Sequence, residues 1–268
     1  MTIQKHVDFE HPPVIEVVCG VSFTPPPGFT VAHLGRFWEE LGSDFPEVKE
    51  VAPLVAVSER FDGSSGVGIA IQVQPQVMMM PRVWFISSGQ DHLVQVQRDR
   101  FLSNWRKVAA QHKYPSYAWV GGKFEEDLQR FESFASRQFG SAPAYTQYEL
   151  TYVNHLLQGS GWSNLGDLGK VFPDCAWRPE VNRFLPMPEA IDWSLSFPFP
   201  DRKGRLHIHL RSGERTEDKR AVLVLELTAR GFSPDRAAWF DLAHEWIVRG
   251  FADLIGQNVQ KSIWRRTK

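Results

Sequence analysis

The chain carries the same order of strand-like and helix-like segments twice, and this repetition constrains its fold more than any single motif. In each half, a strand rich in β-branched residues is followed by a short helix, three strands and a longer helix. Only turns separate consecutive strands, so they pair antiparallel, because a parallel crossover needs a dozen or more residues. The helices must then cover one sheet face. The order predicts an α+β fold: a saddle-like tandem pseudo-repeat of antiparallel sheets with helices on one face.

Each half is expected to form one unit. The first unit, residues 10–142, has predicted strands at 14–23, 67–74, 83–88 and 93–97 and predicted helices at 31–41 and 123–139. The second unit, residues 143–260, has predicted strands at 148–156, 191–199, 205–211 and 221–229 and predicted helices at 164–172 and 233–256. Residues 261–268 form a predicted basic C-terminal tail. Glu16 and Glu149 lie near the middle of the two opening strands, and matched positions of this kind favour a duplication.

Four of the predicted strands alternate between aliphatic and polar residues. Leu206, Ile208 and Leu210 share one face of their strand, so His207 and His209 share the other. The same rule applied to the other three strands places Gln72, Gln74, Gln95, Gln97, Glu226 and Thr228 on the polar face. Such a row makes directional hydrogen bonds without a strong net field. It is either an ordinary solvated surface or a recognition platform.

The charge balance bears on the class of partner. Lys and Arg number 30 against 31 Asp and Glu, which gives a formal charge of -1. A sequence-independent grip on nucleic acid or anionic lipid needs a surplus of basic residues, so neither is favoured. No apolar run is long enough to span a membrane, and the first residues lack a signal-peptide pattern, so we expect a cytoplasmic protein.

The sequence offers little catalytic or cofactor chemistry. Cys19 and Cys175 are too few for a disulfide framework; Cys19 is expected to be a small buried hydrophobe. There is no phosphate-binding loop and no nucleophile motif, and no catalytic residue, cofactor or metal is assigned. One alternative is a metal-dependent enzyme that uses His207, His209 and Glu226, because alternate residues on a strand could share a metal ion. Another is a nucleic-acid binder that uses the Arg98–Arg106 cluster, where arginines adjoin aromatic rings.

Several motifs in combination resemble a known family. They are Pro12–Val17, Gln97–Phe101, Asn104–Arg106, Tyr114-Pro115, Glu149–Asn154, His244 and Trp264. Over nearly the whole chain they are similar to a sporadically distributed bacterial family of uncharacterised proteins of about this length. The resemblance implies no activity, but its patchy distribution suggests an antiviral defence or toxin–antitoxin setting. It marks Arg98, Asp99, Arg100, Asn104, Trp105, Arg106, Tyr152 and Asn154 as positions to test.

These observations together favour a non-enzymatic binding protein that presents a polar sheet face to a protein partner, such as a toxin or another defence component. The residues expected to bind that partner are Gln72, Gln74, Gln95, Gln97, Arg98, Arg100, Asn104, Trp105, Arg106, Asn154, His207, His209 and Glu226.

Overall fold

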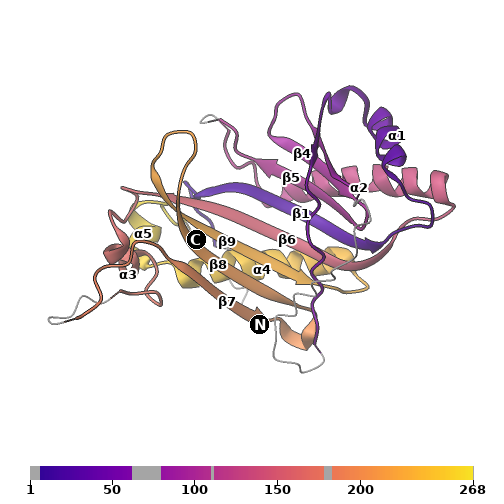
Figure 1. The fold of residues 1–268 in the computed structure, drawn as a ribbon. Coiled ribbons are helices and arrows are strands. Elements are labelled where there is room, and N and C mark those ends of the chain that lie inside the picture. The colour runs from indigo at the N-terminus through magenta and orange to yellow at the C-terminus, as the bar shows by residue number, and fades with distance from the viewer. Residues whose placement is uncertain (1–6, 62–79, 110–111, 178–182, 268) are drawn as a thin grey trace.

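A nine-stranded antiparallel sheet forms the body of the protein in this computed structural model, which describes residues 7–61, 80–109, 112–177 and 183–267 (Figure 1). The strands are β1 (Val14–Thr24), β2 (Glu47–Val51), β3 (Arg82–Ile86), β4 (His92–Gln97), β5 (Arg100–Arg106), β6 (Ala144–Leu157), β7 (Asp192–Pro198), β8 (Gly204–Glu214) and β9 (Ala221–Gly231). The α-helices are α1 (Val31–Leu41), α2 (Tyr117–Phe139), α3 (Leu168–Val171), α4 (Arg236–Leu254) and α5 (Gln257–Ser262). Among these described helices, none combines the length and apolar content needed to cross a membrane.

The two halves of the chain join edge to edge through β1 and β6. The strand order is β2-β3-β4-β5-β1-β6-β9-β8-β7, and every neighbouring pair is antiparallel. Val18 pairs with Thr151 near the middle of the β1–β6 ladder. The predicted α+β class with antiparallel pairing is therefore confirmed, and the pairing is continuous across the expected boundary between residues 142 and 143.

Two strands differ from the sequence prediction. Residues 100–106, expected to flank a strand end, form β5, which pairs with β1 on one side and with β4 on the other. Its polar residues lower its intrinsic strand propensity, but two neighbouring ladders override that preference. The short strand β2 was not predicted, because its alternation with charged residues is weak. The strand expected at 67–74 lies outside the described residues.

The first residue of α2 and the buried face of α4 also differ slightly from the sequence prediction. α2 begins at Tyr117 rather than near Lys123, because Ser116 caps it by accepting a hydrogen bond from the Trp119 amide. The expected inner stripe of α4 was Trp239, Leu242, Trp246, Gly250 and Leu254. The structure keeps Trp239 and Leu254 and otherwise buries Phe240, Ala243, Ile247, Phe251 and Ala252. The stripe rotates by about one residue, since successive helical side chains lie about 100° apart.

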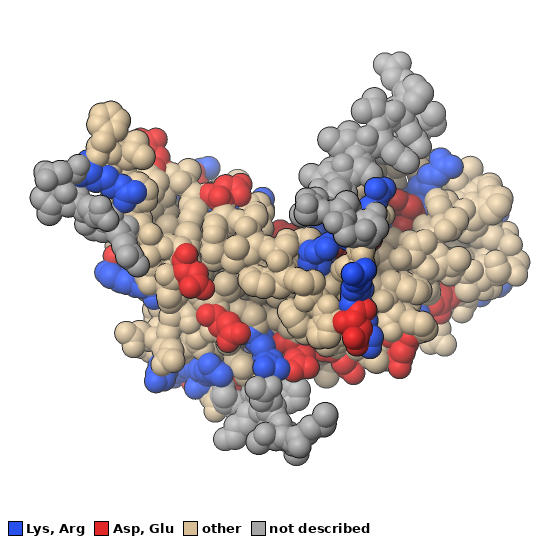
Figure 2. All heavy atoms as spheres, turned by 90° about the horizontal axis from the view of Figure 1, so that it is seen from below, with Lys and Arg blue, Asp and Glu red and all other residues tan. Residues whose placement is uncertain are grey.

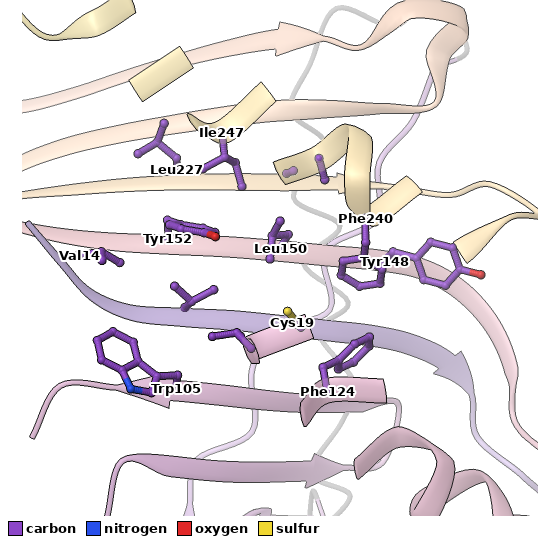
Figure 3. Packing of buried hydrophobic residues seen from close by; sticks show 14 of the residues in the cluster. Val14, Cys19, Trp105, Phe124, Tyr148, Leu150, Tyr152, Leu227, Phe240 and Ile247 are labelled. Atoms are coloured by element: carbon purple, nitrogen blue, oxygen red, sulfur yellow. The ribbon is translucent and has the colours of Figure 1, made fainter. Parts of the chain in front are cut away.

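The core lies between the sheet and its helices. Figure 3 shows side chains of β1, β5, β6 and β9 on this side, among them Cys19 and Leu150, both fully buried. Phe124 of α2 and Phe240 of α4 meet above the β1–β6 ladder, with ring centroids 5.0 Å apart. The prediction for Cys19 is confirmed, and burial raises the pKa of its thiol well above the usual value.

The residues expected to form a basic tail pack against the N-terminal segment. Trp264 is buried and its ring contacts the ring of Phe9, whose centroid lies 6.2 Å away. Backbone hydrogen bonds join Thr267 to Asp8 and Glu10 to Arg265. Burial of a large aromatic ring explains why this charged segment does not extend into solvent.

Candidate functional site on the outer sheet face

We call the sheet face that points away from α1, α2 and α4 the outer face. The ladders place Gln95, Gln97, His207, His209 and Glu226 there, with His209 directly opposite Glu226. The predicted alternation is thus confirmed for β4, β8 and β9. Three alternate residues of β5 belong to the same face: Arg100, Asn104 and Arg106. The first two pair with Gln97 and Leu93 of β4, and Arg106 pairs with Glu16 of β1.

Five predicted partner-binding residues are not placed on the outer face by the structure. Trp105 and Asn154 project to the helix side, where both are buried, so the structure does not present them to a partner. Arg98 is exposed in the turn between β4 and β5. Gln72 and Gln74 lie outside the described residues.

Residues 52–61, here called the strap, cross the outer face, which we expected to be open (Figure 1). The side-chain amide of Gln97 accepts a hydrogen bond from the Leu54 amide at 2.9 Å and donates to the Leu54 carbonyl at 3.1 Å. Gln147 of β6 accepts from the Glu59 amide and donates to the Val57 carbonyl, both at 2.9 Å. Each glutamine side chain therefore hydrogen-bonds the strap backbone as a neighbouring strand would. The strap covers part of the row of polar side chains on the outer face.

The strap ends in an ion-paired cluster on β8. The Glu59 carboxylate contacts both Arg205 and, at 2.5 Å, Nε2 of His207. Burial alone would raise the pKa of Glu59, but the hydrogen bond and charge of His207, together with Arg205, lower it below the usual value. His207 thus anchors a segment of its own chain, which sequence alternation could not reveal because Glu59 lies 148 positions away.

A second polar cluster lies on the outer face of β3, β4, β5 and β1. It contains three arginines, Arg82, Arg100 and Arg106, which we call the arginine cluster. Trp84 lies between two of them, 5.6 Å from the guanidinium carbon of Arg82 and 6.0 Å from that of Arg106. Arg100 is only 6% exposed, whereas Arg82, Trp84 and Arg106 are partly exposed.

Glu16 is a buried carboxylate beside Arg82 and Arg106 of this cluster. Asn104 donates a hydrogen bond of 2.6 Å to Glu16, and Gln95 donates one of 2.9 Å to Asn104. Burial raises the pKa of Glu16 above its usual value, although Asn104, Arg106 and Arg82 act in the opposite direction. Burial and the neighbouring charge of Arg100 lower the pKa of Arg82.

Several polar atoms of this cluster have unfilled hydrogen-bonding capacity. Within the described part of the chain, four buried atoms in or beside the cluster have no hydrogen-bond partner: Nε of Arg82, Nε of Arg100, Nε1 of Trp84 and Oε1 of Gln95. Buried polar groups are nearly always bonded, and each unsatisfied group costs about 1–3 kcal/mol. Their concentration at one place marks the cluster as a candidate binding site.

The structure does not assemble the metal set considered from the sequence. Nε2 of His209 contacts Asp192 at 2.8 Å, whereas Nε2 of His207 contacts Glu59. The two imidazoles therefore face different carboxylates. No group of three or more His, Cys, Asp or Glu side chains suited to a metal ion occurs among the residues that the structure describes.

A serine, a histidine and an aspartate meet beneath α2. Nε2 of His92 lies 2.8 Å from Asp127 and 3.2 Å from the Ser103 hydroxyl, which itself donates to Asp127 at 2.8 Å. In a nucleophilic triad, the two imidazole nitrogens contact serine and carboxylate separately. Here one nitrogen faces both groups, so the contacts fix α2 to the sheet and do not form a proton relay.

Sequence reasoning missed a cleft of about 870 Å³ on the helix side, between the N-terminal residues and α4. The hydroxyls of Tyr114 and Tyr152 lie 2.9 Å apart, and the rings of Tyr117 and His244 stack at 3.8 Å. Burial raises the pKa values of all three tyrosines, so they remain neutral hydrogen-bonding groups. Their separation along the chain concealed the site, although Tyr114, Tyr152 and His244 had each stood out in the sequence.

Neither the surface charge nor the comparison with known proteins assigns a function to these sites. Figure 2 shows basic and acidic side chains scattered over the face seen from below. A scan of protein-family models finds no match for this chain, and a search of curated proteins finds no significant relative.

Proposed function

We propose that this chain is a non-enzymatic binding protein whose arginine cluster holds an acidic segment of a protein partner. The observation that carries the proposal is the buried Arg100, whose Nε, like that of Arg82, lacks a hydrogen-bond partner within the described structure. Glu16 interacts with Arg82 and Arg106, and Glu47 also acts on Arg106, whereas Arg100 lies further along β5 beside Ser22. An added anion would therefore complete the cluster at Arg100 and Arg82. Carboxylates suit this task because a guanidinium binds them through two parallel hydrogen bonds.

A protein partner fits these surroundings better than a nucleic acid does. The net charge of -1 provides no general attraction for a phosphate backbone. Beyond the cluster, the outer face continues as the amide and imidazole groups of Gln97, Gln147 and His207, of which the glutamines already bind backbone. The half-buried Arg82, Trp84 and Arg106 are the parts that a partner would reach first. The family resemblance makes a toxin or another defence component the class of partner to try first.

The same proposal includes an internal duplication with a saddle-like sheet. Outward from the β1–β6 ladder, β5, β4 and β3 match β9, β8 and β7, and β2 extends the first half by one further strand. Glu16 pairs with Arg106 on one side, and Glu149 pairs with Arg230 on the other. The two glutamates are equally placed on either side of the central Val18–Thr151 pair, as a two-fold arrangement requires.

Fluorescence polarisation with short labelled peptides tests the binding claim. Peptides rich in Asp and Glu should bind the wild-type protein, and their Asn and Gln counterparts should not. Arg100→Gln should weaken binding about tenfold or more, because a charge-assisted pair contributes about 1.5–3 kcal/mol. Arg98→Gln is the matched control, since Arg98 is exposed only two positions away and should leave binding unchanged.

Two results would overturn this function. The first is the absence of binding to any acidic peptide by a folded wild-type protein. The second is binding of short single-stranded RNA or DNA with a steep salt dependence that Arg100→Gln abolishes, which would make the chain a nucleic-acid binder. Co-purification with the product of an adjacent gene, lost in Arg100→Gln and retained in Arg98→Gln, would identify the partner.

A further inference from the structure

An apolar groove of about 420 Å³ lies on the helix side of the sheet, where β7 and β8 pass beside the last turns of α4. Its floor and walls are Leu195, Phe197, Leu206, Ile208, Trp246 and Leu254. No residue of β7 is buried, and Phe197 is 41% exposed. Leu195, Phe197 and Trp246 keep apolar surface in contact with water, which is unfavourable by about 25 cal/mol for each Å².

The strand ladders identify the corresponding place in the first half of the chain. Cys19 and Tyr152 each follow the central Val18–Thr151 pair by one residue. From Cys19 outward, the paired residues are Ser103, Val94 and Phe85. From Tyr152 outward, they are Leu227, Ile208 and Leu195. Leu195 and Ile208 of the groove therefore occupy the positions that Phe85 and Val94 hold in the first half.

In the first half, α1 covers this place. Its fully buried Phe37 contacts Phe85 of β3 and Phe131 and Phe134 of α2, with ring centroids 5.3–5.8 Å apart. In the second half, the helix that follows β6 is α3, which has four residues and lies beside α5. Among the described helices, none takes the position over β7 that α1 takes over β3. The groove is thus a helix-binding surface without its helix.

The charges around the two places are opposite in sign. In the first half, α2 presents Arg130 to Asp44 and Arg137 to Glu40, at and just beyond the C-terminal end of α1. The rim of the groove carries Asp174, Glu245 and Asp253 and a single arginine, Arg249, which already pairs with Glu245. An acidic helix such as α1 would meet carboxylates here, whereas a basic helix would be attracted.

We propose that this groove binds a basic amphipathic helix of a partner protein, with an aromatic side chain at the position that Phe37 takes on α1. The groove lies on the opposite side of the sheet from the arginine cluster, so this inference is independent of the function proposed above. The acidic rim argues against α1 of a second copy as the occupant, because that helix carries Glu39 and Glu40.

A peptide made from residues 30–44 provides the probe. In the basic version, Glu39, Glu40 and Asp44 are replaced by Lys; the native sequence and a basic version with Phe37→Ala are the controls. We expect the basic peptide to bind the full-length protein about tenfold more tightly than the native peptide, since two or three exposed ion pairs amount to that difference. The basic peptide without the aromatic ring should bind at least tenfold more weakly.

Variants of the protein place the peptide in the groove. Phe197→Asp introduces a charge at an exposed wall position and should abolish binding, whereas Ser194→Asp, on the opposite face of β7, should not. Asp253→Lys should reverse the charge preference, so that the native peptide binds more tightly than the basic one. This reversal is a gain of binding, and a misfolded protein could not produce it.

Three outcomes would overturn the inference. They are the absence of binding by the basic peptide, equal losses in Phe197→Asp and Ser194→Asp, and a preference for the native peptide by the wild-type protein. The last outcome would indicate an exchange of α1 between two copies of this chain. Circular dichroism of each variant confirms that it retains the wild-type fold before binding is measured.

Discussion

Gln147 offers a direct test of how the strap is attached to the sheet. Its side chain makes two hydrogen bonds of 2.9 Å to strap backbone, one from the Glu59 amide and one to the Val57 carbonyl. Gln147→Ala removes both. A neutral hydrogen bond contributes about 0.5–1.5 kcal/mol, so the pair accounts for about 1–3 kcal/mol. The strap can partly lift and let water replace the glutamine, and we therefore expect a loss near the middle of that range, about 2 kcal/mol.

Hydrogen exchange measures this loss at individual amides. A loss of about 2 kcal/mol in local stability corresponds to roughly thirtyfold faster exchange, because each 1.4 kcal/mol is a factor of ten. In Gln147→Ala the Glu59 amide should show this acceleration. Gln97→Ala should accelerate the Leu54 amide in the same way, because that amide donates to Gln97.

The control is Gln138→Ala, which removes an exposed glutamine that bonds to Arg36 at 3.1 Å on the helix side. It should change neither amide. Unchanged exchange at Glu59 in Gln147→Ala would refute the attachment described here. Equal acceleration of the strap amides in all three variants would also refute it, since the effect would then be global.

The remaining predictions concern the ion-paired end of the strap, the core and a close backbone approach. Glu59→Gln should cost about 1–3 kcal/mol at neutral pH in urea unfolding, since it leaves the partly buried Arg205 without its carboxylate partner. The native pKa of Glu59 lies below its usual value of 4.5, so the carboxylate stabilises the fold above that pH and its contribution is lost as the pH falls further. The difference in free energy of unfolding between wild type and Glu59→Gln should therefore become smaller in acid. A difference that does not change with pH would contradict this prediction. Phe37→Ala should cost about 3–5 kcal/mol in thermal or urea unfolding, and a cost below 1 kcal/mol would show that the ring is not packed as described. Gly231→Ala would bring a Cβ within 2.1 Å of the Lys203 carbonyl and should destabilise at the upper end of about 1–3 kcal/mol, whereas Gly213→Ala meets nothing within 4 Å and should be tolerated.

The features that depend on local sequence were predictable. The alternation of Leu206, Ile208 and Leu210 with His207 and His209 set the face of every residue of β8, because the period of a strand is two. The antiparallel pairing followed from the short connections between strands. Both inferences use neighbours in sequence, and the structure agrees with both.

The features that depend on distant contacts were not predictable. Polar residues of β5 form a central strand because β1 and β4 pair with it from both sides. Gln97 and His207, expected to face a partner, bind the strap instead. Nothing near either residue in the sequence indicates that residues 52–61 cross the sheet, because a strap held by side-chain amides needs no periodicity of its own.

The β1–β6 ladder has a consequence for synthesis. β1 can pair with β5 once residue 106 has emerged from the ribosome, but its other edge has no neighbour until β6 is complete at residue 157. At about 5–20 residues per second, that interval lasts roughly 3–10 s. An unpaired edge is a template for other chains. A nascent chain released between these two points would expose the β6-facing edge of β1, so truncation within this window should yield aggregates rather than a stable half-molecule.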